Sequence, residues 1–398
     1  MRSARVLSAK NGASVRERLE TYLPASLAAQ SAAAGDVAAI VVDAAGPGAL
    51  QLTNALRGAG AFAWIEGDRL VVSASRSALA LAAELLEGSA RELAGELVRA
   101  FDADRSPAPA LRLRDRVLEL SERARVMGIL NVTPDSFFDQ GRYDGVDRAR
   151  ARAAEMVALG ADLIDVGGQS YSAANAEVAA DEEAARVVPV VRALVRDGLG
   201  VPLSVDTFRA DVAERALDAG AHLINDCSGL SDDRLAEVVA RAEASLVVMH
   251  LRGRLNIREA EYPYEDAMAE ILEYLRERTD RAVLAGIGRD AIVVDPGLEF
   301  GKEPHTDLEI LERFGDLRSL GFPILIAASR KSFLGHIFDL PASELLVPSL
   351  ACAAIGIAAG ARFVRVHDVA ETVAVARMLG AVRSAGRSHL PAIVQGLA

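Results

Sequence analysis

The chain has 398 residues, of which 51% are hydrophobic and 25% charged, and its formal net charge at pH 7 is −12. This composition supplies enough apolar surface for a large core, so it excludes a mainly disordered chain, and the length predicts two or three domains. The acidic balance argues against nucleic-acid and anionic-membrane partners, because phosphate-rich surfaces are bound by basic faces.

Cysteine usage and the first residues indicate the compartment. The two cysteines, Cys227 and Cys352, are far apart in the sequence, and each lies among core-like residues. A disulfide framework or zinc site is therefore not expected, and a reducing compartment is. Residues 1–5 begin no apolar signal segment, and no run reaches the ~18 apolar residues of a membrane span. We expect a cytoplasmic protein.

Residues 1–104 are rich in Ala and predict a small α+β domain whose role the sequence does not reveal. Runs of β-branched residues and apolar residues at helical spacing mark its elements. The expected elements are strands at 37–42 and 70–72, a hairpin partner at 62–65, and helices at 49–59 and 77–101. A polar, Pro-containing stretch then predicts a linker at 105–110.

Residues 111–386 form the second predicted domain, in which one unit recurs eight times between residues 124 and 385. The unit is a short β-branched run that ends in polar residues and is followed by a helical stretch. The runs are 126–132, 163–166, 203–205, 223–224, 246–249, 292–294, 324–327 and 363–366. Eight β/α units in about 260 residues predict an α/β fold, a closed (β/α)₈ TIM barrel with its active site at the C-terminal strand ends. Alternation at 111–120 predicts a hairpin that closes the N-terminal end, and residues 387–398 are a C-terminal tail.

One predicted helix of the barrel, at 350–361, has no polar face. A helix that is apolar all round must be covered on both sides. We therefore predict a homodimer that forms through this helix, and the alternative is that the N-terminal domain covers it.

Polar side chains follow the predicted strands, and a barrel gathers such side chains at one mouth. Asp206, Asn225 and Asp295 end the third, fourth and sixth runs, and Lys331 follows the seventh. The carboxylates can accept hydrogen bonds from ring amino and N–H groups, while the amide and the ammonium can donate to ring oxygen or nitrogen. The set predicts a flat, hydrogen-bonding heterocycle as ligand. Taken singly, a strand-end Asp is more often a helix N-cap or a turn residue.

A second set of residues suits an anion. Residues 329–332 (Ser-Arg-Lys-Ser) follow the seventh run, and Arg365 and His367 end the eighth. Loops after strands seven and eight are where this fold most often binds phosphate. Asn131, at the end of the first run, suits Mg²⁺, which takes oxygen ligands and usually keeps several waters. A solvated face is the alternative for the basic residues, but here they interrupt apolar strands in an acidic protein.

Several motifs together resemble the dihydropteroate synthase family. They are residues 126–137, 165–168, 204–207, 225–226, 295–297 with 300–302, 329–332 and 365–368. The motifs occur in the family's order over residues 111–385. The resemblance implies a transferase of folate biosynthesis that joins 6-hydroxymethyl-7,8-dihydropterin pyrophosphate to p-aminobenzoate and releases dihydropteroate and pyrophosphate.

The resemblance also implies a role for each site residue. Asp206, Asn225, Asp295 and Lys331 hold the pterin; Asn131 with Mg²⁺, Arg365 and His367 hold the pyrophosphate; and Ser332 faces the aminobenzoate carboxylate. Of these, Asn131, Lys331, Arg365 and His367 are the expected catalytic residues, and Asn131 is the metal ligand. Because departure of pyrophosphate leaves a delocalised cation, catalysis consists mainly of stabilising the leaving anion and excluding water until the arylamine attacks.

Two loops depart from the family. After the second strand the family has Gly-Gly-Glu-Ser-Thr-Arg-Pro-Gly, whereas residues 167–174 here are Gly-Gly-Gln-Ser-Tyr-Ser-Ala-Ala, so that Ser172 replaces an Arg. The loop after the first strand carries Phe138 and Gln140, and Arg142 is a candidate for the missing charge. The pterin pocket is expected to be intact and the second-substrate pocket altered.

Two other functions stay open at this point. The altered loop favours a pterin-binding paralogue without synthase activity, which the complete pyrophosphate set opposes. A methyl-folate-dependent methyltransferase of the same barrel type shares the pterin-holding strand ends. It has no use for Asn131 together with Arg365 and His367, so these residues disfavour it.

Overall fold

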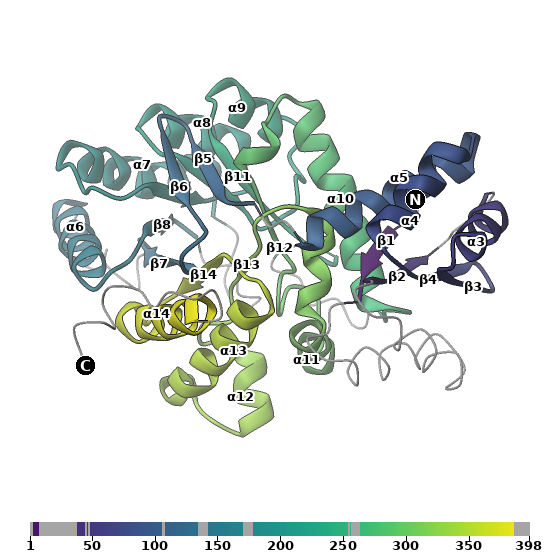
Figure 1. The fold of residues 1–398 in the computed structure, drawn as a ribbon. Helices are drawn as coiled ribbons and strands as arrows, with labels where there is room; N and C mark the ends of the chain where they lie inside the picture. The colour runs from purple at the N-terminus through teal and green to yellow at the C-terminus, as the bar shows by residue number, and fades with distance from the viewer. Residues whose placement is uncertain are drawn as a thin grey trace. The chain divides into compact units, whose positions relative to one another are not determined.

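The computed structural model describes residues 3–7, 38–43, 46, 48–105, 108–133, 142–169, 178–253, 255 and 263–385. The chain divides into two compact units. The first comprises residues 1–107 together with 265–276 and 312–322, and the second comprises the remainder. Figure 1 shows the helices and strands of both.

The first unit is built on an antiparallel sheet in the order β1-β2-β4-β3. Its elements are β1 (Ser3–Val6), β2 (Ala38–Asp43), α3 (Ala49–Gly58), β3 (Phe62–Glu66), β4 (Arg69–Ala74), α4 (Arg76–Leu85) and α5 (Gly88–Arg105). β3 and β4 form the expected hairpin, and Gly67 in its turn has φ +59°. Apolar side chains from the sheet and these helices form one core, in line with the predicted α+β arrangement.

One expectation for this unit is wrong. The chain forms α4 and α5 instead of a single helix over 77–101, because the backbone leaves helical geometry between them. Leu86 is extended, with φ −93° and ψ 161°, and Gly88 has φ +54°. The break lets the two helices pack against each other and bury apolar residues in the same core. Amphipathic spacing continues across the break, so it conceals the turn.

Two later segments of the chain belong to the first unit. Arg318 in η3 (Phe314–Leu320) pairs with Asp104 near the end of α5 at 2.8 Å. Arg276 in α10 (Ala267–Leu284) donates to the Ala4 carbonyl at 3.1 Å. Burial raises the pKa of Asp104, and the charge of Arg318 opposes that rise. α5 extends to Arg105, so the helix enters the stretch predicted as a linker.

Eight parallel strands of the second unit form a barrel, as predicted. They are β7 (Arg125–Asn131), β8 (Leu163–Gly167), β9 (Leu203–Asp206), β10 (Leu223–Asp226), β11 (Ser245–Met249), β12 (Ile292–Asp295), β13 (Leu325–Ile326) and β14 (Phe363–Val366). β14 pairs with β7, and a parallel bridge between Val294 and Ile324 joins β12 to β13. The ring is thereby closed, and the eight polar strand ends lie at one mouth.

Helices surround the strands on the outside (Figure 1). After β7 the described helices of this unit are α6 (Arg142–Ala158), α7 (Ala180–Arg196), α8 (Ala210–Asp218), α9 (Leu235–Arg241), the last part of α10, η2 (Arg289–Ala291), α11 (Pro304–Glu312), α12 (Ser332–Phe338), η4 (Ala342–Glu344), α13 (Leu346–Ala359) and α14 (Val369–Ala385). β5 (Ala110–Leu113) and β6 (Arg116–Glu119) form the predicted hairpin. Leu111 and Leu113 pack with Met127, Leu163 and other residues near the strand starts, so the hairpin closes the N-terminal end.

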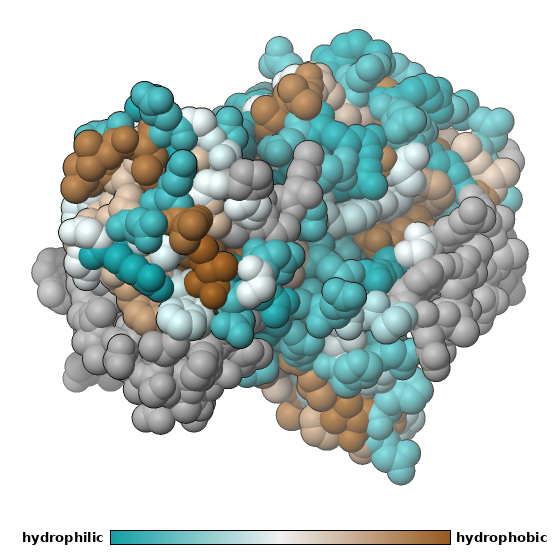
Figure 2. Space-filling model, turned by 90° about the vertical axis from the view of Figure 1, so that its right-hand side faces the viewer, coloured by the Kyte–Doolittle hydropathy of each residue, from teal (hydrophilic) through white to brown (hydrophobic). Residues whose placement is uncertain are grey.

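Helix α13 has the apolar composition that predicts an interface. On its buried side, a Cβ added to Gly356 would lie 2.5 Å from Ile326 Cδ1, so the helix packs closely on β13. On its other side, Val347 is 72% and Ile355 46% exposed in the single chain. The face in Figure 2 is largely hydrophilic, with hydrophobic residues gathered in separate patches. None of the helices in the described ranges is both long and apolar enough to cross a membrane.

Candidate active site

A cluster of polar side chains from neighbouring strand ends occupies the barrel mouth. Arg365 of β14 lies with Nε 2.6 Å from Asp165 Oδ2 and Nη2 2.6 Å from Asp206 Oδ2. Asn225 of β10 donates from Nδ2 to the same Asp165 oxygen at 3.0 Å. The structure thus brings together Asp206 and Asn225, two of the residues predicted to bind a heterocycle. It places Arg365, predicted to bind an anion, beside them. Asp165, to which the sequence analysis assigns no role, binds both neighbours.

The two carboxylates of this cluster retain unused acceptor capacity. Asp165 Oδ1 and Asp206 Oδ1 are buried and have no hydrogen-bond partner among the described residues. Burial raises the pKa of Asp206 to about 7; the charge of Arg365 opposes this rise and that of Asp165 adds to it. Because a buried acceptor without a donor is costly, the cluster suits a ligand that presents several donors, such as amino and N–H groups on a ring.

Asp295 ends β12, and Lys331 directly precedes α12 in the loop after β13, on the other side of the ring of strands. Asp295 Oδ1 accepts a hydrogen bond from Gly297 N (2.7 Å). Lys331 Nζ donates to Leu298 O (2.5 Å) and lies 4.7 Å from the centre of the Phe300 ring. Burial raises the pKa of Asp295 and lowers that of Lys331, and in each case the charge of the other residue opposes the shift. Together with Phe300, the pair offers a carboxylate, an ammonium and an aromatic face to one ligand.

The loop after β12 is held by a lysine that the sequence analysis assigns only to a motif. Lys302 Nζ donates to the carbonyls of Gly297 (2.7 Å), Phe300 (3.0 Å) and His250 (3.4 Å). Gly297 has φ +67°, and a Cβ there would lie 2.0 Å from His250 O, so the turn requires glycine. Burial lowers the pKa of Lys302 to about 7. The signal in the sequence is its position directly after the Phe-Gly pair of the motif.

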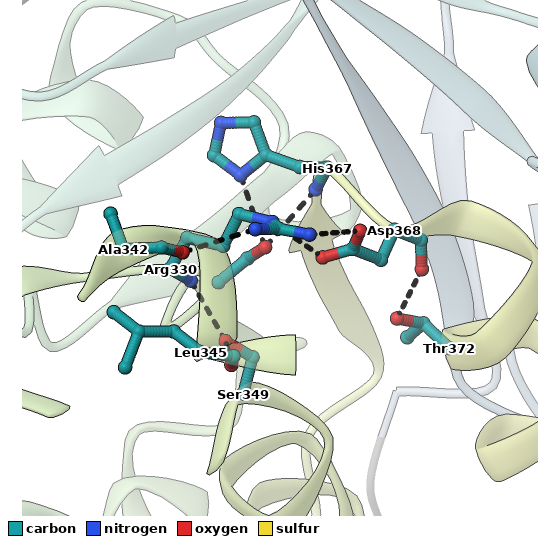
Figure 3. A network of polar contacts seen from close by, with 8 residues as sticks. Arg330, Ala342, Leu345, Ser349, His367, Asp368 and Thr372 are labelled. Carbon is teal, nitrogen blue, oxygen red and sulfur yellow. Dashed lines mark hydrogen bonds and ion pairs between the residues drawn. The ribbon is translucent and has the colours of Figure 1, made fainter. Parts of the chain in front are cut away.

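The loops after β13 and β14 are joined by an ion pair and by a histidine (Figure 3). Arg330 binds Asp368 in bidentate fashion, with Nε and Nη2 at 2.9 and 2.8 Å from the two carboxylate oxygens. His367 Nδ1 lies 3.0 Å from Ser329 Oγ. Burial lowers the pKa of His367 to about 4, and the charge of Arg365 adds to this effect. Arg330 Nη1 also donates to the Ala342 carbonyl at 3.1 Å, so all three guanidinium nitrogens of Arg330 are engaged. His367 is uncharged at pH 7.

Asn131 of β7 and Asp206 of β9 lie level with each other on the two strands that flank β8. The register pairs Asn131 with Gly167 and Gly167 with Asp206, so one row of residues crosses β7, β8 and β9. A Cβ on Gly167 would lie 3.3 Å from Asn131 Oδ1 and 4.0 Å from Asp206 Oδ2. Gly167 therefore leaves both polar groups space at the centre of the row.

Of the two altered loops, after β7 and after β8, the structure describes only the residues next to the flanking strands and helices. Gln169 Oε1 accepts a hydrogen bond from Arg209 Nη1 at 3.2 Å, and the buried Glu183 pairs with the same guanidinium. Burial raises the pKa of Glu183, and the charge of Arg209 opposes this rise. Residues 134–141 and 170–177, with Phe138, Gln140 and Ser172, lie outside the described residues, as does the side chain of Arg142.

Comparison with known proteins agrees with this geometry. Residues 127–367 match the family model described as "Pterin binding enzyme". Dihydropteroate synthase of Bacillus subtilis (strain 168) is 40% identical over 280 residues, which are 70% of this chain and 95% of the relative. The chain belongs to the dihydropteroate synthase family. The Escherichia coli (strain K12) member is 40% identical over 268 residues, or 67% of this chain and 94% of that member.

Solved structures of the family have the same barrel. The Yersinia pestis dihydropteroate synthase in a sulfonamide drug complex superposes with a TM-score of 0.65 at 40% identity, covering 69% of this chain and 99% of that one. The Xanthomonas albilineans enzyme in complex with 7,8-dihydropteroate gives 0.62 at 36% identity, with 69% and 99% covered. The pterin-binding TIM barrel predicted from the motifs is therefore confirmed.

Proposed function

We infer that this barrel is a dihydropteroate synthase, a transferase that joins 6-hydroxymethyl-7,8-dihydropterin pyrophosphate to p-aminobenzoate in folate biosynthesis. The observation that carries the inference is the cluster around Asp165 and Asp206, whose buried, unpartnered oxygens suit the donors of a pterin ring. It occurs in a chain that is 40% identical to a curated dihydropteroate synthase.

The pterin ring is proposed to bind between two groups of side chains. Asp206 and Asn225 offer acceptors and an amide donor on one side of the mouth. Asp295 and Lys331 offer a second carboxylate and a cationic donor on the other. A bicyclic ring with donors along one edge and acceptors along the other can satisfy both groups at once, which explains why so many polar side chains are buried together.

Arg365 and His367 are proposed to hold the pyrophosphate. Arg365 lies in β14, and His367 directly follows the strand. Arg365 keeps its positive charge, because Asp165 and Asp206 offset its burial, and its Nη1 takes part in neither ion pair. His367 is neutral and directs Nδ1 to Ser329, which leaves Nε2 for a phosphate oxygen. Arg365, a fixed cation, and His367, a neutral donor, can therefore stabilise the negative charge that develops on the leaving pyrophosphate.

We further propose Asn131 as a ligand of Mg²⁺. Its amide oxygen is of the type that Mg²⁺ prefers, and it lies beside Gly167, which has no side chain to fill the space at the centre of the strand row. The described ranges contain no group of three or more His, Cys, Asp or Glu side chains arranged for a metal ion, so substrate oxygens and water would supply most ligands. When bound, the ion would neutralise the pyrophosphate as it leaves.

The acceptor amine attacks the pterin methylene as pyrophosphate departs. The new C–N bond replaces the C–O bond, and the amine then loses one proton. An aromatic amine is already neutral at pH 7, so no protein nucleophile or strong base is required. The residues act by holding the ring, stabilising the departing anion and excluding water. Ser332, the residue after Lys331, is proposed to form the acceptor side and to meet the aminobenzoate carboxylate.

Arylamine-dependent release of pyrophosphate tests this function. Purified protein is mixed with the pterin pyrophosphate, p-aminobenzoate and Mg²⁺, and release is followed with and without the amine. Release that requires the amine supports the synthase. Tight pterin binding without release would instead identify a binding paralogue.

We also propose an oligomeric state and a cellular location. The exposed Val347 and Ile355 of α13 would be covered if two chains paired through this helix, so we propose a homodimer. Light scattering that gives a monomer at micromolar concentration would contradict it. Cys227 and Cys352 are both buried, and so low a cysteine content suits a reducing compartment, so we propose that the enzyme is cytoplasmic.

A further inference from the structure

Both hydrogen-bond donors of Ser332 are engaged by one glutamate. The Ser332 N–H donates to Glu299 Oε1 at 2.8 Å, and the Ser332 hydroxyl binds the same oxygen. Glu299 therefore places a carboxylate at the residue proposed above to receive the carboxylate of p-aminobenzoate. We infer that Glu299 is a specificity-determining residue that competes with the acceptor's carboxylate for Ser332. This inference rests on the proposed function.

The backbone at Glu299 is strained in a way that supports a role. Glu299 has φ +72°, in the left-handed region that favours glycine. Such strain persists where the surroundings hold it, and it clusters at functional sites. Here Asp307 Oδ1 accepts the Glu299 N–H at 2.8 Å, and Lys331 binds the preceding carbonyl, that of Leu298, at 2.5 Å. The loop is thus fixed on both sides of Glu299, and its side chain is directed at Ser332.

The chemistry of this contact separates anionic from neutral acceptors. A carboxylate on the acceptor ring must displace Glu299 from Ser332 and then lie near a second negative charge. A neutral amide at the same ring position avoids the charge repulsion and can donate to Glu299. Glu299 is half-buried, so the repulsion is only partly screened by water. The acceptor side therefore favours arylamines with a neutral para substituent more than a site without Glu299 would.

A comparison of two acceptors tests the inference. KM is measured for p-aminobenzoate and for p-aminobenzamide with the wild type, Glu299→Ala and Glu299→Gln. Since hydrogen bonds to a charged group are the strong ones, Glu299→Ala should lower the KM of p-aminobenzoate about tenfold and change that of the amide less than about twofold. Glu299→Gln keeps the size of the side chain and should give part of the same effect. Equal changes for both acceptors, no change, or a higher KM for p-aminobenzoate would overturn the inference.

Two controls separate competition from a structural effect. Glu243 is also a glutamate at positive φ (+51°), but it precedes β11 at the opposite end of the barrel, so Glu243→Ala should leave both KM values unchanged. In a double-mutant cycle, Glu299→Ala should lower the KM of p-aminobenzoate less in the Ser332→Ala background, because that background lacks the hydroxyl and keeps only the backbone N–H. An undiminished gain in the Ser332→Ala background would show that Glu299 does not act through Ser332.

Equilibrium binding distinguishes failure of this inference from failure of the proposed function. p-Aminobenzoate is titrated into each variant saturated with pyrophosphate and a non-reactive pterin. Tighter binding by Glu299→Ala supports the competition even if turnover is absent, and absent turnover then counts against the synthase alone. Unchanged binding with normal turnover counts against Glu299 alone. If no variant binds p-aminobenzoate, both are overturned.

Discussion

The two halves of the barrel mouth are built differently. The half that contains Asp165, Asp206, Asn225 and Arg365 takes its side chains from residues within regular strands. The half that contains Lys331 and Ser332 depends on loops with positive φ at Gly297, Glu299, Gly301 and Arg330. Strand register fixes the first half, whereas the second follows the local sequence of two loops. Substrate preference can therefore change in the loop-built half while the strand-built half keeps its geometry.

The largest effect is expected from the strand-built half. Asp206→Ala removes a buried acceptor and one of the two carboxylates that bind Arg365. Pterin binding should weaken at least about a hundredfold, because donors of the ring and of Arg365 lose their partner together. Fluorescence titration with a pterin measures it. Retention of wild-type affinity would show that this cluster is not the ring site.

The rigidity of the loop-built half can be tested through its turn. Gly297→Ala should destabilise the barrel by at least about 3 kcal/mol, because the added Cβ would meet His250 O in addition to the strain of positive φ. Gly198 is the matched control, since it has φ +64° and nothing within 4 Å of an added Cβ. Gly198→Ala should cost only about 1 kcal/mol. Urea unfolding of both variants gives the comparison, and equal losses would contradict the close approach.

The pH dependence of pterin binding should come from the strand-built half. Burial raises the pKa of Asp206 to about 7, so its carboxyl gains a proton as the pH falls below that value. A protonated Asp206 loses acceptor capacity. Affinity should therefore be highest above pH 7 and fall toward a limit of about tenfold per pH unit below it. Titrations between about pH 5.5 and about pH 8.5 test this sign, and Glu299→Gln should have the same profile. Affinity that rises on acidification would reverse the assignment.

The smallest effect is expected at Arg330. Because all three nitrogens of its guanidinium are engaged by Asp368 and the Ala342 carbonyl, Arg330→Met should change the KM of the pterin pyrophosphate less than about twofold and lower stability by about 1 kcal/mol or less. Arg365→Ala, by contrast, should raise that KM at least about tenfold. Steady-state kinetics and thermal unfolding of the two variants make the distinction. Equal effects on KM would place Arg330 at the substrate.

The pattern of residues along the chain is enough to predict the barrel and most of the polar side chains at its mouth. Eight apolar runs with polar ends predict β/α units, because side-chain period and strand-end position are properties of the local chain. Asp206, Asn225, Asp295, Lys331, Arg365 and His367 follow from those positions alone.

Which of these side chains form ion pairs or hydrogen bonds with one another depends on the folded chain. Arg365 binds Asp165 from 200 positions away, Arg330 binds Asp368 from 38, and Glu299 binds Ser332 from 33. Such choices depend on which loops meet once the ring closes, and on the burial that makes an unpaired charge costly. No local pattern carries that information. The same reason explains the break between α4 and α5, where core packing interrupts a helical pattern that continues in the sequence.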